Sequence, residues 1–411
     1  MPGPLSHLTV LDLSRVLAGP WCTQLLADLG ADVIKIEKPG SGDDTRTWGP
    51  PFLKDTQGRD TGEAAYYLGC NRGKKSVAVD FTQSEGQAIV RDLARAADVV
   101  VENFKVGGLK KYGLDYPSLA TANPRLVYCS ITGFGQTGPY SERAGYDFII
   151  QGMGGFMSVT GERDGAPGGG PQKAGIAIAD LMTGMYAAAA ILAAIAHREL
   201  SGAGQYIDTS LFDTQVAMMA AMDMNYLVSG KPPGRAGNAH QNIVPYQVFA
   251  CADGHLILAV GNDAQFARFC DVAGKPEWAM DPCFATNAGR VQQRDVLVPM
   301  IADVVLGRTQ RDWLTALEAV GVPCGPINRV DQVFADPQVQ ARGMRFDLPH
   351  PLSGTVPQVG NPLNFSATPV TYTQAPPLLG EHTWAVLSAR LGLSRESLAD
   401  LVARGVIQLN K

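Results

Sequence analysis

The sequence predicts an α/β protein built on a doubly wound parallel sheet, with a second, smaller α+β domain. Three observations support this prediction. The N-terminal third alternates short apolar strands with amphipathic helices, which is typical of parallel strands joined by right-handed crossovers. Two alternating apolar runs near residue 250 are separated by a turn, which indicates an antiparallel hairpin outside that sheet. A chain of 411 residues is long enough for one large or two ordinary domains.

The first predicted unit runs from strand to helix to strand. Apolar residues predict strands at 8–13 and 32–37, and helical spacing predicts a helix over 21–29 that stops at Gly30. Residues 14–20, between the first strand and this helix, are expected to form a loop. That loop lacks G-x-G-x-x-G, so the sheet is Rossmann-like without a dinucleotide motif, and no tightly bound cofactor is indicated.

The same alternation continues along the chain and then changes character. Strands are predicted at 76–81, 99–101, 126–131 and 207–211, with helices over 85–96 and from about 181 onward. The smaller domain, residues 225–326, is predicted to hold a hairpin (243–250 and 255–260) and helices near 264–272, 290–305 and 310–319. Residues 1–224 form the predicted large domain, completed by 327–411, whose loops and short strands end in a helical pair.

Composition excludes several classes of function. The net charge of −5 argues against nucleic acid as a partner. The seven cysteines are scattered and contain no C-x-x-C pair, so we expect a reducing compartment, no metal site and no disulfide framework. Residues 1–7 lack a signal pattern, and the apolar run 176–196 contains an aspartate, so it is predicted to be a core helix rather than a membrane span. We expect a cytoplasmic enzyme.

That aspartate, Asp180, is the most informative residue of the sequence. It lies in an otherwise apolar run, residues 174–196, where a carboxylate is costly unless hydrogen bonds or a positive field hold it. A helix N-terminus supplies both, so Asp180 is expected at or near the first turn of a buried helix. The local pattern leaves two readings open: an N-cap with no other role, or a carboxylate nucleophile in a dry pocket.

Basic residues follow or precede several of the predicted strands. They occur in Glu37-Lys38, in Asn71-Arg72-Gly73-Lys74-Lys75 and in Asn103-Phe104-Lys105. Each alone is typical of a solvated surface charge. Because several meet the ends of strands in one sheet, together they favour a ligand that carries phosphate.

Longer motifs resemble the class III CoA-transferases, the formyl-CoA transferase family, over nearly the whole chain. They are L-D-L-S-R-V-L-A-G-P (11–20), L-G-A-D-V-I-K-I-E (29–37), S-G-D-D-T-R (41–46), V-E-N-F (101–104), S-I-T-G-F-G-Q-T-G-P (130–139) and L-L-G-E-H-T (378–383). Finer features, R-T-W-G-P-P-F (46–52), R-A-G-Y-D (143–147) and I-V-P-Y-Q (243–247), resemble the succinate–hydroxymethylglutarate CoA-transferase branch.

The resemblance implies an activity and a set of site residues. Asp180 in Ile178-Ala179-Asp180, with Gly184, matches the catalytic motif and would form an anhydride and then an aspartyl-CoA thioester. Acyl-CoA is implied as a substrate, and an interlocked homodimer as the assembly. The implied CoA-binding residues are Val16, Lys38, Asn71, Arg72, Lys74, Lys75, Asn103 and Lys105. The substrate pocket is expected to include Leu17, Arg46, Trp48, Arg143, Tyr146, Gly154 and Gly155, the two glycines as possible oxyanion donors.

The identity of the two acids stays open. Leu17 replaces the glutamine of formyl-CoA transferase, and the long glycine loop of that enzyme is absent near Asn242, so formyl-CoA and oxalate are not expected. We expect succinyl-CoA as donor and a dicarboxylate as acceptor, with Arg46, Arg143 and His240 as candidates for its far carboxylate. The alternatives are an α-methylacyl-CoA racemase-like enzyme and a non-catalytic CoA-binding protein. Gly145-Tyr146-Asp147 replaces the Gly-His-Asp of racemases, which favours the transferase.

Overall fold

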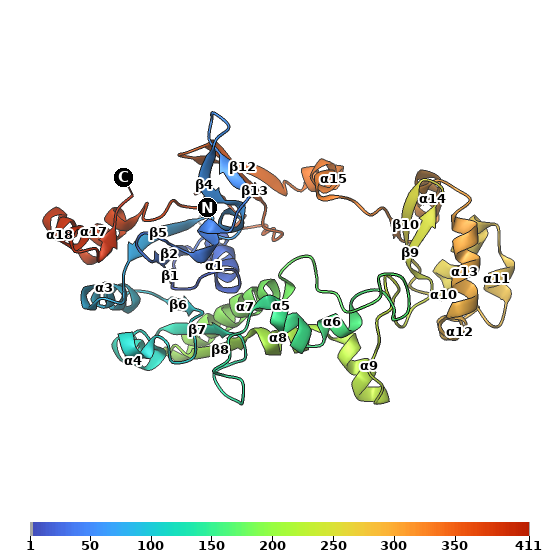
Figure 1. The fold of residues 1–411 in the computed structure, drawn as a ribbon, viewed down its shortest axis with the longest axis horizontal. Coiled ribbons are helices and arrows are strands. Elements are labelled where there is room, and N and C mark those ends of the chain that lie inside the picture. Colours follow the sequence, from blue (N-terminus) through green and yellow to red (C-terminus); the bar gives the residue numbers. More distant parts are fainter. Residues whose placement is uncertain (1–2, 411) are drawn as a thin grey trace. The chain divides into compact units, whose positions relative to one another are not determined.

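A sheet of seven strands organises the larger of two units in the computed structural model, which describes residues 3–410. Its strand order is β14-β5-β2-β1-β6-β7-β8, and the strands pair in parallel except at β14, which runs antiparallel to β5. The strands are β1 (Thr9–Asp12), β2 (Asp32–Glu37), β5 (Lys74–Val79), β6 (Val99–Glu102), β7 (Val127–Thr132), β8 (Tyr206–Ser210) and β14 (Ile407–Gln408) (Figure 1). The predicted parallel α/β sheet is therefore confirmed.

Helices cover both faces of this sheet because its strands alternate two sets of apolar side chains. Val10, Val99 and Val101 point into a core shared with one layer of helices, whereas Leu11 and Val100 point into the opposite core. The first layer contains α1 (Ala18–Asp28), α5 (Asp147–Met153), α7 (Ile178–Ser201) and α8 (Leu211–Met218). The second contains α3 (Ser84–Arg95), α4 (Tyr116–Ala122), α17 (Thr383–Leu391) and α18 (Arg395–Ala403).

Helix α7 is the long apolar helix that the sequence predicted around Asp180. Its length and apolar composition would allow it to cross a membrane, but the core helix of a globular protein can have the same length and composition. Ala187, Ala188 and Ile191 are buried in the first core, and α7 packs along α1 (Figure 1). The packing agrees with the prediction of a core helix.

Shorter elements decorate the large unit. Two antiparallel hairpins, β3 with β4 and β12 with β13, were not predicted strand by strand, although polar and apolar residues alternate in β12 from Arg345 to Leu348. The remaining elements are β3 (Phe52–Lys54), β4 (Asp60–Ala64), β12 (Arg345–His350), β13 (Gly354–Val359), α2 (Ala65–Leu68), α16 (Pro337–Ala341) and the 3₁₀ helices η1 (Asp44–Thr47) and η2 (Lys110–Tyr112). Helices α6 (Phe156–Val159) and α9 (Ala221–Ser229) lie at the unit boundaries.

The second unit packs helices on a small antiparallel sheet with the order β11-β10-β9. Its core gathers aromatic side chains, among them Phe249, Phe266, Phe269 and Trp313. The elements are β9 (Tyr246–Cys251), β10 (Gly254–Ala259), β11 (Cys324–Gly325), α10 (Asp263–Ala273), α11 (Glu277–Met280), α12 (Asn287–Gln292), α13 (Arg294–Val305), α14 (Gln310–Ala319) and α15 (Val330–Ala335). The predicted hairpin is present as β9 and β10.

The two units divide the chain slightly differently from the predicted boundaries. The large unit comprises Met1–Phe156, Ala174–Met224 and Pro337–Lys411, and the second comprises Met157–Lys173 and Asn225–Asp336. Residues 157–173, a stretch rich in glycine, lie with the second unit, because Arg235 donates to the carbonyl oxygen of Glu162 and forms an ion pair with Asp164.

Two predicted helix boundaries are wrong. Helix α1 begins at Ala18 rather than at Trp21, because Pro20 falls in the first turn, where a proline needs no N–H partner. The helix predicted over 290–305 is two helices, α12 and α13, that meet at Gln293, whose φ of −98° and ψ of 20° leave the helical region. The earlier start of α1 brings its N-terminus closer to the end of β1.

Candidate active site

The site lies at the switch point of the sheet, where the order in which the chain adds strands reverses. From β1 the chain adds β2 and β5 on one side and β6, β7 and β8 on the other, so the loops after β1 and β6 diverge. Ligands in such sheets bind in the crevice beyond the carboxyl ends of the strands at this point. Asn103 joins the two loops: its side chain accepts from the N–H of Arg15 at 2.9 Å and donates to the Arg15 carbonyl oxygen at 2.6 Å.

Asp180 lies in the first turn of α7, as predicted. It is the third residue of the helix, and the N-cap residue is Ala177, so the reading of Asp180 as only an N-cap is wrong. Burial raises the pKa of Asp180 to about 7, and the charge of Asp147 adds to that rise. The Asp180 carboxyl group is therefore a stronger base than an ordinary aspartate, which suits a nucleophile.

Asp147, the first residue of α5, performs the capping that Asp180 does not. One of its carboxylate oxygens accepts from the N–H of Ala179 at 2.8 Å and from the N–H of Asp180 at 3.4 Å, and the other accepts from Gln151 at 2.6 Å. A carboxylate from a separate helix thus satisfies the first-turn donors of α7. The sequence analysis missed this role, since Asp147 lies 33 residues away from Asp180.

A cavity of about 200 Å³ opens beside Asp180. The N-terminus of α1, the loop after β6 and the segment before α5 form its walls, and no histidine of the described residues lines it. Seven predicted site residues meet there: Val16, Leu17, Asn103, Lys105, Arg143, Tyr146 and Asp180.

A second cavity, of about 540 Å³, shares Arg15, Phe104 and Lys105 with the first. Four lysines line it: Lys35, whose ammonium is buried 2.9 Å from Asp43, the predicted Lys38 and Lys105, and Lys111 of η2. We call Lys38, Lys105 and Lys111 the cavity lysines. The sequence analysis missed Lys111, although its place shortly after Asn103, beyond the same strand, offered a signal.

Lys74 and Asn71 point into the interior of the fold instead. The Lys74 ammonium is fully buried, 3.2 Å from the Asp12 carboxylate and 2.9 Å from the Asn71 amide oxygen. Asn71 is likewise fully buried, and its amide nitrogen donates to the Tyr67 carbonyl oxygen at 3.0 Å. These enclosed contacts argue against the predicted role of both residues in contacting CoA.

Arg72, Lys75 and Arg46 are also paired with carboxylates. Arg72 is buried in an ion pair with Asp28 at 2.6 Å, and Lys75 lies 2.6 Å from Asp32 at the amino ends of their strands, away from the crevice. Arg46 is buried against Glu37 at 2.8 Å and Glu63 at 3.2 Å. With its guanidinium engaged, Arg46 is a poor candidate for a substrate carboxylate.

Trp48 approaches the nucleophile through a second aromatic residue. Its ring, 43% exposed, meets Tyr66 edge to face with 5.2 Å between centroids. Burial and then the charge of Asp180 raise the pKa of Tyr66 to about 12, which identifies Tyr66 as a neighbour of the nucleophile that the sequence analysis missed. Gly154 and Gly155 are not among the residues that line the cavity beside Asp180, and the Gly154 N–H already donates to the Ile150 carbonyl oxygen at 2.7 Å.

Arg143 is the candidate of the three that lines the cavity beside Asp180. Its guanidinium stacks over Tyr140 at 4.6 Å and Phe134 at 5.3 Å, and its one side-chain hydrogen-bond contact among the described residues is a weak one, 3.8 Å to the sulfur of Met153. The third candidate, His240, belongs to the second unit, where its backbone N–H donates to Tyr246.

Comparisons with known proteins find relatives over nearly the whole chain. The model of CoA-transferase family III matches residues 5–383. A succinate–glutarate CoA-transferase of Agrobacterium fabrum is 55% identical, covering 94% of this chain and 95% of that protein. The human succinyl-CoA:glutarate CoA-transferase is 41% identical over 98% of this chain and 90% of its own. A crystal structure of a CAIB/BAIF family protein from Brucella suis has a TM-score of 0.83 at 51% identity, covering 95% of this chain and all of that one.

Proposed function

This chain belongs to CoA-transferase family III, and we propose that it moves coenzyme A from succinyl-CoA to a dicarboxylic acid. Glutarate is the proposed acceptor, because it appears in the names of the relatives from Agrobacterium fabrum and human. The observation that carries the proposal is Asp180, a carboxyl group of raised pKa that faces a cavity at the switch point of the sheet.

The proposed reaction uses Asp180 as a covalent carrier. Its carboxylate attacks the thioester carbon of succinyl-CoA and expels the CoA thiolate, which leaves a mixed anhydride. The thiolate then attacks the aspartyl carbonyl of the anhydride, releasing succinate and forming an aspartyl-CoA thioester. Glutarate attacks this thioester to give a second anhydride, and the returning thiolate attacks its glutaryl carbonyl, forming glutaryl-CoA and regenerating Asp180. Each step exchanges one acyl leaving group for another.

The N-terminus of α1 supports this chemistry. Leu17 and Ala18, at the N-terminus of α1, line the same cavity as Asp180, and the first N–H groups of a helix have no partner within the helix. We propose that these N–H groups, rather than those of Gly154 and Gly155, stabilise the oxyanions that develop at each attack.

Positive side chains support the binding of both substrates. The cavity lysines surround the larger, 540 Å³ cavity, which suits the phosphates of CoA, and Lys105 lines the smaller one as well. Arg143 lines the smaller cavity, and we propose that it pairs with the far carboxylate of the dicarboxylate. A monocarboxylate would leave this guanidinium without that partner, so it should be a poorer acceptor.

A direct assay tests the proposed function. Purified protein is incubated with succinyl-CoA and an excess of glutarate, butyrate or no acid, and the CoA esters are separated by chromatography. We expect glutaryl-CoA to form with equimolar succinate, and butyryl-CoA to form at least about tenfold more slowly, the cost of one unpaired charged contact. Equal rates with butyrate would refute the dicarboxylate assignment. Deuterium exchange at the α-carbon of a 2-methylacyl-CoA, without transfer, would favour the racemase.

We also propose that the chain assembles as a homodimer, in the interlocked form that its family resemblance implies. Large apolar side chains of α7, α8 and α9 support this, since Leu200 is 91% exposed, and Val216 and Met224 are also exposed. Exposed apolar side chains mark an interface where they form a contiguous patch. Light scattering should give a mass twice that of the 43.6 kDa chain, and a monomeric mass at micromolar concentration would refute the proposal.

A further inference from the structure

Val16 has a backbone conformation that its side chain disfavours. Its φ is 70°, in the left-handed region, where a β-branched residue is a genuine outlier. Such strain persists only where the surrounding structure enforces it, and it gathers at functional sites. Val16 lines the cavity beside Asp180 and directly precedes Leu17 and Ala18, the proposed oxyanion donors.

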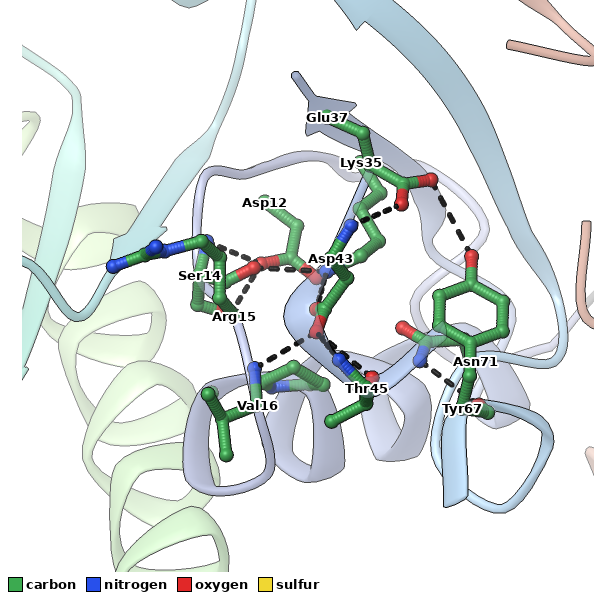
Figure 2. Close-up of polar contacts among 12 residues, drawn as sticks. Asp12, Ser14, Arg15, Val16, Lys35, Glu37, Asp43, Thr45, Tyr67 and Asn71 are labelled. Atoms are coloured by element: carbon green, nitrogen blue, oxygen red, sulfur yellow. Dashed lines mark hydrogen bonds and ion pairs between the residues drawn. The ribbon is translucent and has the colours of Figure 1, made fainter. Parts of the chain in front are cut away.

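Side chains from separate elements hold the backbone of residues 14–16. Ser14 donates its N–H to Asp12 at 2.9 Å, and its carbonyl oxygen accepts from Lys35 at 2.8 Å. The Asn103 amide binds both backbone groups of Arg15, as described above. The Val16 N–H donates to Asp43 at 3.2 Å. Figure 2 shows the Asp12, Lys35 and Asp43 side chains converging on this loop.

Asp43 is the member of this group that contacts the strained residue. One carboxylate oxygen accepts from Val16 N–H and from both the N–H and the hydroxyl of Thr45, at 3.2, 3.0 and 2.8 Å. The other lies 2.9 Å from the Lys35 ammonium. The residue is 1% exposed, and the Lys35 charge and the Thr45 hydrogen bonds outweigh its burial, so that its pKa falls to about 2.

We propose that Asp43 is a positioning residue for CoA transfer, which holds Val16 in the left-handed conformation and thereby fixes the N-terminus of α1 opposite Asp180. The inference rests on the proposed function, since the reaction is what the loop serves. Asp43 does not line the cavity beside Asp180, but it does line the larger cavity. If its contact were lost, Val16 would relax toward negative φ and the following N–H groups would turn away from the reacting carbonyl.

Asp43→Asn tests the proposal with little change in volume. An asparagine has one oxygen where Asp43 uses two. In either orientation its NH₂ group faces donors, the Lys35 ammonium or the N–H groups of Val16 and Thr45. We expect kcat to fall about 100-fold, the cost of misplacing catalytic groups by about an ångström. KM for succinyl-CoA should change less than about threefold, because the cavity lysines are untouched and Asp43, which lines the same cavity, is only 1% exposed.

Val16→Gly separates positioning from general stability. Glycine adopts a φ of 70° without strain, so the loop of the Val16→Gly variant needs Asp43 much less. Val16→Gly itself alters the cavity wall, so the comparison is made within that background. There, Asp43→Asn should lower kcat less than about tenfold, against about 100-fold with Val16 present. An equal loss in the two backgrounds would overturn the proposal.

Asp28→Asn is the matched control. Asp28 is also buried in an ion pair, with Arg72 at 2.6 Å, but it contacts neither loop of the crevice. It should lower the melting temperature as Asp43→Asn does while leaving kcat within about twofold of the parent. A comparable loss of kcat in both variants would mean that instability alone explains the effect.

Amide hydrogen exchange gives a readout that does not depend on the substrates. We expect Asp43→Asn to accelerate exchange of the N–H groups of residues 14–18, and Asp28→Asn to leave them unchanged. Unchanged exchange in Asp43→Asn would refute the positioning role even if transfer were slow. If the parent protein transfers no CoA but Asp43→Asn still accelerates exchange, the proposed function is refuted, whereas the role of Asp43 in holding residues 14–16 is retained.

Discussion

Replacing Asp147 by asparagine is expected to move the pH dependence of CoA transfer. If transfer requires ionised Asp180, kcat/KM for succinyl-CoA follows the ionised fraction of that group in the free enzyme. With a pKa of about 7, this fraction is about 0.09 at pH 6 and about 0.9 at pH 8, so kcat/KM should rise about tenfold over that interval. An aspartate with its ordinary pKa of 3.8 would give no rise.

The sign of the Asp147 effect follows from charge. Its carboxylate disfavours ionisation of Asp180, so Asp147→Asn removes a repulsion, lowers the pKa of Asp180 and moves the acid limb to lower pH. The asparagine oxygen can still accept from the N–H of Ala179, which preserves the first turn of α7. Because burial is the larger cause of the raised pKa, part of the tenfold rise between pH 6 and pH 8 should remain.

The assay is initial-rate kinetics from pH 5.5 to 8.5 at constant ionic strength and saturating glutarate, so that ionisation of the acceptor does not limit the rate. Asp92→Asn is the control, since it removes an exposed carboxylate of α3 on the opposite face of the sheet and should leave the profile unchanged. A flat profile in the parent, or an acid limb that moves to higher pH in Asp147→Asn, would refute the electrostatic account of the nucleophile.

Three further outcomes are expected. Replacing any of the cavity lysines by methionine should raise KM for succinyl-CoA about tenfold with a smaller effect on kcat. Lys75→Met, at the amino end of β5, is the control, and an unchanged KM in all three cavity-lysine variants would place the phosphates elsewhere. Arg143→Gln should bring the rates with glutarate and butyrate closer together in a competition assay, and an unaltered ratio would exclude Arg143 as the carboxylate partner. Because folding raises the pKa of Asp180, the folded protein loses stability as the pH rises from about 4 to about 7. Asp180→Asn should therefore raise the melting temperature markedly at pH 8 and little at pH 4, and the reverse order would contradict the raised pKa.

Much of the fold could be predicted because it depends on local patterns. The strands of the large sheet are short apolar runs, and α3 shows a clean helical stripe, so their existence follows from periodicity. The start of α1 could not be predicted in this way, since Gly19 and Pro20 read as loop residues although a first turn tolerates them. The small hairpins of the large unit are stabilised by tertiary packing, which local sequence does not report.

The site divides along the same line. Asp180 could be predicted because a single carboxylate in an apolar run is unusual. The roles of Asp147, Tyr66 and Asp43 depend on hydrogen bonds or charge interactions across 33, 114 and 27 residues, to Asp180 or to Val16, which no local pattern encodes. The same limit misled the prediction for Lys74, which looks in sequence like other basic residues near strand ends. Whether a lysine meets solvent or a buried carboxylate such as Asp12 is decided by the packing of α1 on the sheet.

The covalent state of Asp180 during turnover decides whether this residue carries CoA. The protein is incubated with succinyl-CoA without acceptor, its intact mass is recorded, and a second sample is treated with hydroxylamine and mapped by peptide mass spectrometry. We expect a CoA adduct on the intact chain and, after hydroxylamine, a hydroxamate at Asp180 that is absent from Asp180→Asn. Transfer of CoA to glutarate at an undiminished rate by Asp180→Asn, or a hydroxamate at another carboxylate, would exclude Asp180 as the covalent carrier.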